Sequence, residues 1–107
     1  MLQLLMASLL CLSLSTTSSF HFKSIRAEQH TLSWQVANEQ RFGQFFIQRK
    51  RTHTWVSFKV MNCKGEKGVV GYALPVMLQK GENHLRIKYL DLAGRSHYSP
   101  EVSMWIE

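Results

Sequence analysis

The stretch Gly81-Glu-Asn-His-Leu-Arg-Ile-Lys-Tyr-Leu-Asp-Leu-Ala-Gly-Arg-Ser-His-Tyr-Ser99 decides the fold. Apolar and polar residues alternate through its first half, with Leu85 and Ile87 on one side, and this two-residue period is typical of a β-strand. The segment Asp91-Leu-Ala-Gly94 then predicts a tight turn into a second strand. Because a two-stranded hairpin with one apolar face is marginally stable in water, the rest of the chain must supply strands that cover it.

Five segments before this hairpin show the same alternation, namely residues 20–26, 31–36, 44–50, 55–61 and 69–74. The hairpin adds two strands, the second of which continues past Pro100 to residue 106, and no helical period occurs after residue 20. Seven short strands within about 90 residues predict an all-β, two-sheet sandwich. The side chains expected on core-facing sides are Leu32, Trp34, Val36, Phe45 and Ile47, with Val56, Phe58 and Val60 together on one face of their strand.

The first 19 residues have the composition of a secretory signal. Residues 1–14 are rich in Leu and Met and carry no charge, and the Ser/Thr-rich run that follows offers cleavage after Ser15 or Ser19. The apolar run is shorter than the roughly 20 residues that a bilayer span needs. We therefore predict a signal peptide at residues 1–19 and one domain at residues 20–107, with no membrane span in the mature chain. The alternatives are an uncleaved anchor and a β-strand.

Charge and cysteine content narrow the class of protein. All charged side chains follow residue 20, so the formal net charge of +6 belongs to the predicted domain. Such an excess favours contact with polyanions, here an anionic glycan or an acidic protein partner, because export would remove cytosolic nucleic acid from the possible partners. Removal of the signal would leave Cys63 without a partner for an intramolecular disulfide, so the apolar core must hold the domain together.

An ordered set of short motifs runs through most of the chain. It consists of Leu32-Ser33-Trp34, Glu39, Phe45-Phe46-Ile47-Gln48-Arg49, Trp55, Tyr72, Gly81-x-Asn83, Arg86-Ile87-Lys88, Asp91-x-x-Gly94 and Tyr98-Ser99. The match covers residues 20–102 and resembles the fibronectin type III-like modules of bacterial secreted and cell-surface proteins, particularly those exported by the type IX route. This resemblance implies a seven-stranded immunoglobulin-like sandwich and an extracytoplasmic location, whether secreted, periplasmic or at the cell surface. His84-Leu85 replaces the family's paired tyrosines, so no tyrosine corner is expected there.

A candidate binding face follows if residues 44–50, 55–61 and 83–90 share one sheet. Its outer face is then expected to carry Phe46, Gln48, Lys50, Ser57, Lys59, Arg86 and Lys88. Basic groups around an exposed aromatic ring bind anionic sugars or acidic protein surfaces, so all of these residues except Ser57 form the predicted site. The alternative interpretation is a solvated face on which long side chains lie over the sheet.

No residue pattern in the sequence demands a reaction. The five histidines lack the short paired spacing of a metal site, and no nucleophile-elbow motif frames a serine. We therefore expect no metal, no cofactor and no catalysis, and predict a binding, adhesion or spacer module. Two alternatives stay open: an accessory domain that assembles with another chain by sheet-edge pairing, and a small hydrolase-associated or otherwise unrecognised enzyme.

Overall fold

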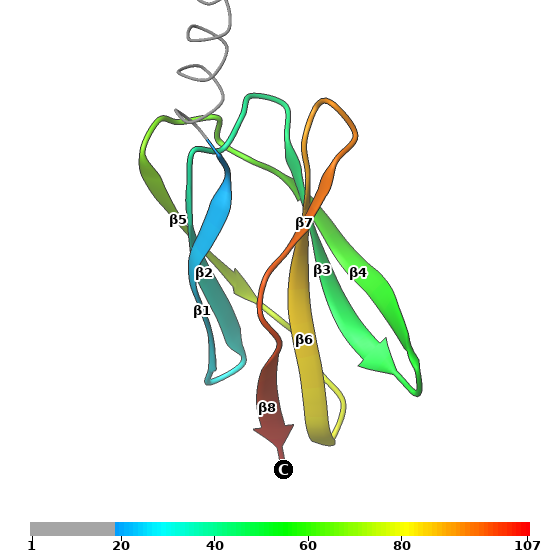
Figure 1. Cartoon of the computed structure of the whole chain (residues 1–107). Helices are drawn as coiled ribbons and strands as arrows, with labels where there is room; N and C mark the ends of the chain where they lie inside the picture. Colours follow the sequence, from blue (N-terminus) through cyan, green and yellow to red (C-terminus); the bar gives the residue numbers. More distant parts are fainter. Residues whose placement is uncertain (1–18) are drawn as a thin grey trace, which may run out of the picture.

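The computed structural model describes residues 19–107, which form two antiparallel β-sheets packed together (Figure 1). The three-stranded sheet has the order β1 (His21–Glu28), β2 (Thr31–Ala37), β5 (Val69–Pro75). The five-stranded sheet has the order β4 (Thr54–Asn62), β3 (Gln44–Arg51), β6 (Gly81–Leu90), and both β7 (Ser96–Tyr98) and β8 (Val102–Ile106) pair with β6. The predicted all-β, two-sheet architecture is confirmed. The predicted signal lies outside the described residues except for Ser19.

The predicted hairpin forms between β6 and β7, closed by a turn at Asp91. The Gly94 amide donates to the Asp91 carbonyl and the Asp91 amide donates to the Arg95 carbonyl, each at 3.0 Å. The Asp91 carboxylate accepts hydrogen bonds from the Arg95 amide at 2.8 Å and the Arg95 Nε at 3.0 Å, and contacts His97 Nε2 at 3.2 Å. The hydrogen bond from the Arg95 amide is the main cause that lowers the pKa of Asp91. The carboxylate therefore holds the turn in its charged form.

We expect Asp91→Asn to lower the melting temperature at pH 7 and to have progressively less effect as the pH falls. Because the pKa of Asp91 is lowered in the folded protein, its charged form stabilises the fold above the unfolded-state pKa of about 4. This contribution is lost as the pH falls through the folded-state pKa. Thermal melts of both proteins between pH 7 and pH 2 measure the difference. The exposed Glu101→Gln serves as control, and a deficit for Asp91→Asn that stays constant with pH would contradict the assignment.

The core lies between the sheets and is built around aromatic rings. Leu32, Trp34, Val36, Phe45 and Ile47 are all buried, as the alternation predicts. The Phe45 ring has its centroid 5.6 Å from that of Trp34, and comparable contacts join it to Tyr72 at 4.8 Å and to Tyr89 at 5.1 Å. Phe45 therefore links both sheets at the centre of the core.

Backbone groups at the start of β6 are capped without a tyrosine corner. The buried Asn83 carboxamide donates to the Gln79 carbonyl at 2.8 Å and to the Gly81 carbonyl at 3.1 Å, while its oxygen accepts the Gln79 amide at 3.3 Å. Leu85, two residues along the strand, is fully buried. A short amide side chain thus ties down the loop between β5 and β6 from inside the fold.

The predicted common face of Val56, Phe58 and Val60 is wrong. The register of β3 against β4 shifts between Ile47 and Gln48, which lie opposite Lys59 and Ser57, so Phe58 is an extra residue in a β-bulge. Because one added residue reverses the alternation, Val60 falls on the opposite face from Val56. Alternation along β4 alone gave no sign of this insertion.

Candidate functional site: the outer face of the five-stranded sheet

The outer face of the five-stranded sheet brings together five of the six residues predicted for the binding face. Residues directly opposite each other in antiparallel strands share a face. Phe46 lies opposite Lys88, and Gln48 lies opposite Arg86. Their neighbours Phe45, Ile47, Leu85 and Ile87 are fully buried on the other side. Lys50, two residues beyond Gln48, lies on the same outer side opposite Trp55.

Lys59 is the exception, and its predicted position on the outer face is corrected by the register. Lys59 lies opposite Ile47, whose side chain is in the core. Lys59 is therefore on the same face of the sheet as the core residues, in what we call the inward row. Val60 takes the outer position opposite Phe46 instead. The bulge at Phe58 is the physical reason, because it reverses the side chains that follow it.

Cations and aromatic rings alternate across this outer face as a ladder, formed by Lys50, Trp55, Arg86, Tyr98, Lys88 and Phe46. The guanidinium carbon of Arg86 lies 4.4 Å from the Trp55 ring centroid and 4.3 Å from that of Tyr98. The Lys88 Nζ lies 5.2 Å from the Phe46 centroid, and the Lys50 Nζ lies 6.0 Å from that of Trp55. Contacts of this kind stabilise a cation by about 0.5–2 kcal/mol, depending on its exposure. We call these six residues the cation–aromatic ladder.

Hydrogen bonds fix Arg86 within the ladder. Its Nε donates to Gln48 Oε1 at 2.7 Å, and Gln48 Nε2 donates to Ser57 Oγ at 3.1 Å. Gln48 is buried although it belongs to the outer face, because these neighbours cover it. Arg86 is therefore a positioned group between two rings, whereas the ammonium groups of Lys50 and Lys88 make no hydrogen bond with other described residues.

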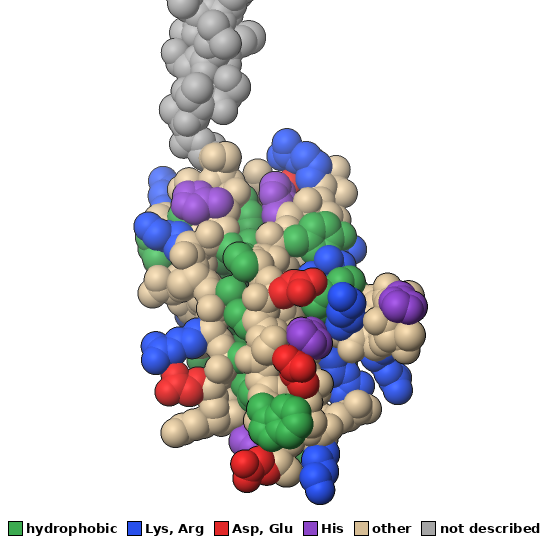
Figure 2. Space-filling view, turned by 60° about the horizontal axis from the view of Figure 1, so that its bottom comes forward, with side chains coloured by type: hydrophobic (Ala, Val, Ile, Leu, Met, Phe, Trp, Pro, Cys, Tyr) green, Lys and Arg blue, Asp and Glu red, His purple; other side chains and the backbone are tan. Residues whose placement is uncertain are grey.

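The positive charge of the ladder is not balanced locally. Within residues 19–107, no carboxylate lies within ion-pair distance of the Lys50, Arg86 or Lys88 side chains. In Figure 2, Lys and Arg side chains gather among apolar ones toward the right, on the side of β3 and β4 in Figure 1. The ladder is therefore suited to a ligand that brings negative charge.

Two ladder residues, Trp55 and Tyr98, were not predicted as part of the site. Trp55 is the register partner of Lys50 across the β3–β4 turn, so the hairpin pairing places it there. Tyr98 is the register partner of Lys88 on the short strand β7 and is 50% exposed. Continued alternation from the Asp91 turn would have identified Tyr98, whereas Trp55 required the register of β3 against β4.

A buried carboxylate occurs elsewhere, at Glu39 in the loop between β2 and β3. Its Oε1 accepts the Tyr72 hydroxyl at 2.5 Å and its Oε2 accepts the Glu66 amide at 3.0 Å. The Tyr72 hydroxyl in turn accepts the Lys64 amide at 2.9 Å. Burial, reinforced by the hydrogen bond to Glu39, raises the pKa of Tyr72. Because both carboxylate oxygens hold neighbouring groups in place, this cluster anchors two loops.

Replacing Tyr72 by Phe is expected to lower the free energy of unfolding by about 1–3 kcal/mol, because the Glu39 carboxylate and the Lys64 amide both lose a partner. The raised pKa of Tyr72 means that its neutral form is favoured in the fold. That stability is complete below the unfolded-state pKa of about 10 and is lost as the pH rises above it. Denaturant unfolding at pH 8 to 11 should therefore show a weaker alkaline loss in Tyr72→Phe than in the wild type.

The matched control for this prediction is Tyr98→Phe, because Tyr98 is 50% exposed. It should unfold like the wild type throughout the same pH range. Equal alkaline slopes in Tyr72→Phe and the wild type would contradict the role assigned to the buried phenol.

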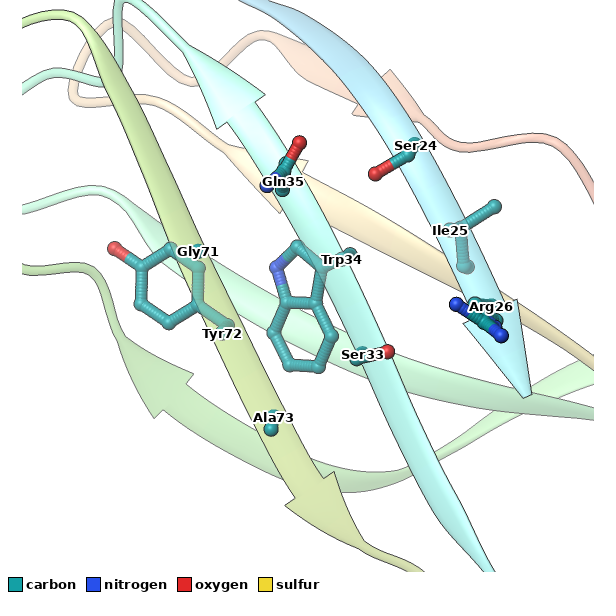
Figure 3. A pocket seen from close by; sticks show the side chains of 9 residues that line it. All are labelled: Ser24, Ile25, Arg26, Ser33, Trp34, Gln35, Gly71, Tyr72 and Ala73. Atoms are coloured by element: carbon teal, nitrogen blue, oxygen red, sulfur yellow. The ribbon is translucent and has the colours of Figure 1, made fainter. Parts of the chain in front are cut away.

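A hollow of about 580 Å³ lies on the three-stranded sheet (Figure 3). Ser33, Gly71 and Ala73 are small residues of its lining, and the Trp34 and Tyr72 rings lie side by side with centroids 5.4 Å apart. Its one basic group, Arg26, is paired with Glu28 at 2.8 Å. The hollow could therefore hold a group that fits its shape, but its one basic side chain is already paired and is not free to bind an anion.

Three further findings concern metal sites, membrane-spanning helices and similarity to known proteins. No group of three or more His, Cys, Asp or Glu side chains in residues 19–107 is arranged to hold a metal ion. The same part of the chain contains no helix long and apolar enough to cross a membrane. No protein-family model matches the sequence, and no curated protein matches it.

Proposed function

We propose that this chain is a non-catalytic, extracytoplasmic binding module of the fibronectin type III-like kind, which binds an anionic glycan through the cation–aromatic ladder. The observation that carries the proposal is the set of three cations, Lys50, Arg86 and Lys88, held among aromatic rings without a described carboxylate beside them. Adhesion or spacing within a bacterial envelope is the corresponding biological role.

The strand order supports the proposed type of sandwich. Immunoglobulin-like sandwiches place their first, second and fifth strands in one sheet and their third, sixth and seventh in the other. The order β1-β2-β5 follows this rule, as does β3-β6-β7 in the second sheet. Both β7 and β8 pair with β6, at Lys88–Leu90 and Gly81–Leu85 respectively. Together they act as one interrupted seventh strand.

The contacts within the ladder favour an anionic ligand over a neutral one. The Arg86 guanidinium covers one face each of Trp55 and Tyr98, which reduces the ring surface on which a neutral sugar would stack. Each lysine ammonium keeps hydrogen-bond donors that anionic oxygens can accept. Arg86 and Lys88, two residues apart on the antiparallel strand β6, place two charges about 6.8 Å apart along the strand. A polymer with repeated sulfate or carboxylate groups therefore suits the face.

Titration with heparin tests the proposal, with polygalacturonate as a carboxylated probe and dextran as a neutral one. We expect the double variant Lys50→Glu/Lys88→Glu to bind the anionic probes at least about ten-fold more weakly than the wild type, because two charges of the site are reversed. Lys23→Glu/Lys80→Glu changes the net charge equally on exposed side chains outside the ladder and is the matched control. Equal weakening in both double variants would contradict a defined site, as would binding of dextran with similar affinity.

A further inference from the structure

Strand β4 forms a free edge of the five-stranded sheet. It stands at the end of the strand order and pairs only with β3 among the described strands (Figure 1). An edge strand presents unpaired backbone N–H and C=O groups, which can pair with a further strand. The opposite side of the sheet differs, because β8 there also packs against β1 of the other sheet.

The β4 edge also carries exposed apolar side chains. Val56 and Phe58 are each 41% exposed, and Val60 is 47% exposed. They stay exposed because β3 is the one described strand with which β4 packs extensively. A partner strand beside β4 would cover part of this apolar surface and gain the free energy of its burial.

The charge of the protein is concentrated around this edge. Residues 40–65 contain six Lys or Arg and no Asp or Glu. The other 81 residues contain seven Lys or Arg and seven Asp or Glu, so their formal charges cancel. The six are Arg41, Arg49, Lys50, Arg51, Lys59 and Lys64. Lys50 belongs to the ladder, whereas the others lie outside it. Arg49, Lys50 and Arg51 lie opposite β4 residues, and Lys59 is on β4 itself. A segment added to β4 would therefore meet positive charge at these positions.

Two features disfavour a second copy of this chain as the added strand. Pairing of two β4 edges would bring the cations of both copies together, and like charges opposite each other are destabilising. The bulge at Phe58 and the inward-row Lys59 are also devices by which edge strands resist self-pairing. The occupant with complementary charge is an acidic segment of another protein.

We propose that the free edge of β4 binds an extended segment of a partner protein in which apolar residues alternate with Asp or Glu, and that this segment adds to the sheet as a further strand. Its apolar side chains lie on the outer face beside Val60, and its carboxylates lie on the other face, where they pair with Lys59 and Arg51. This surface is distinct from the glycan-binding ladder, because its main contacts are backbone groups of β4.

Synthetic peptides test strand addition directly. The probe is the capped peptide Ser-Glu-Val-Glu-Val-Glu-Val-Ser, compared with the same peptide carrying N-methyl groups on every backbone amide and with a version in which Lys replaces Glu. We expect the parent peptide to bind saturably and to slow hydrogen exchange of β4 amides. The N-methylated and Lys-containing peptides should not bind, because the first lacks strand-pairing donors and the second repeats the charge of the edge.

Protein variants locate the site. Lys59→Glu is expected to weaken binding of the parent peptide about five-fold, because it reverses one edge charge. Lys88→Glu, on the ladder, should leave this binding unchanged, so failure of the glycan proposal and failure of the edge proposal give different results. Lys59 is exposed, so the variant should fold normally. The proposal is overturned if the parent peptide does not bind, if the N-methylated peptide binds equally well, or if Lys88→Glu weakens binding as much as Lys59→Glu.

Discussion

Phe45→Ala is expected to lower the free energy of unfolding by about 3–5 kcal/mol, the range for removing a buried aromatic side chain. The Phe45 ring is fully buried and contacts aromatic rings from both sheets, including those of Trp34 and Tyr89. Its removal would leave a cavity between two sheets. Hydrogen bonds between neighbouring strands hold the backbones of these sheets in place, so collapse around the cavity is limited. Urea unfolding measures the loss. A typical domain of this size has about 5–15 kcal/mol of stability, so the variant should be severely weakened.

The control for Phe45→Ala is Phe42→Ala. Phe42 is the same residue type three positions earlier, but its side chain is 76% exposed. Its replacement should change the free energy of unfolding by no more than about 0.5 kcal/mol. A loss below about 1 kcal/mol for Phe45→Ala would mean that this ring is not the centre of the core.

Gly43→Ala is expected to lower the free energy of unfolding by about 2–3 kcal/mol through overpacking. A Cβ at Gly43 would lie 2.5 Å from two ring carbons of Tyr89 and closer still to its hydroxyl. The buried Tyr89 ring would have to move away from its hydrogen bond with the Gln40 amide, which is 2.9 Å long. Gly43 is therefore required for the close approach of this loop to the ring.

Gly71→Ala is the matched control for Gly43→Ala. The nearest atom to a Cβ at Gly71 is a Gln35 side-chain carbon at 4.0 Å, which is ordinary contact. Since alanine also favours strand conformation more than glycine does, Gly71→Ala should unfold at the same or slightly higher urea concentration. Equal stability of the two variants would contradict the packing of Tyr89 against Gly43.

Much of the fold follows from local alternation, and its main failure has a local cause. The pattern through Leu32, Trp34 and Val36 identified buried residues because β2 lies in the middle of its sheet and one face is fully covered. The same reasoning failed in β4, where a single extra residue at Phe58 reverses the pattern. Sequence alternation alone does not specify a bulge, since its position depends on pairing with β3.

The candidate site, like the fold, could be predicted from the sequence only in part. Arg86 and Lys88 were placed correctly because Leu85 and Ile87, between and beside them, fix the buried face of β6. Lys59 was misplaced by the bulge. The stacking of Arg86 between Trp55 and Tyr98 required side chains from three strands in register, which no single-strand pattern contains.

The glycan-binding proposal is tested most directly by the three tryptophan indole N–H signals in a ¹H–¹⁵N NMR titration with a heparin oligosaccharide. Trp55 belongs to the ladder, whereas Trp34 is 1% exposed in the core and serves as an internal reference. We predict a saturable shift of the Trp55 signal together with the backbone amides of Arg86 and Lys88, and no shift of the Trp34 signal. An unchanged Trp55 signal, or saturable shifts confined to the three-stranded sheet, would contradict binding at the ladder.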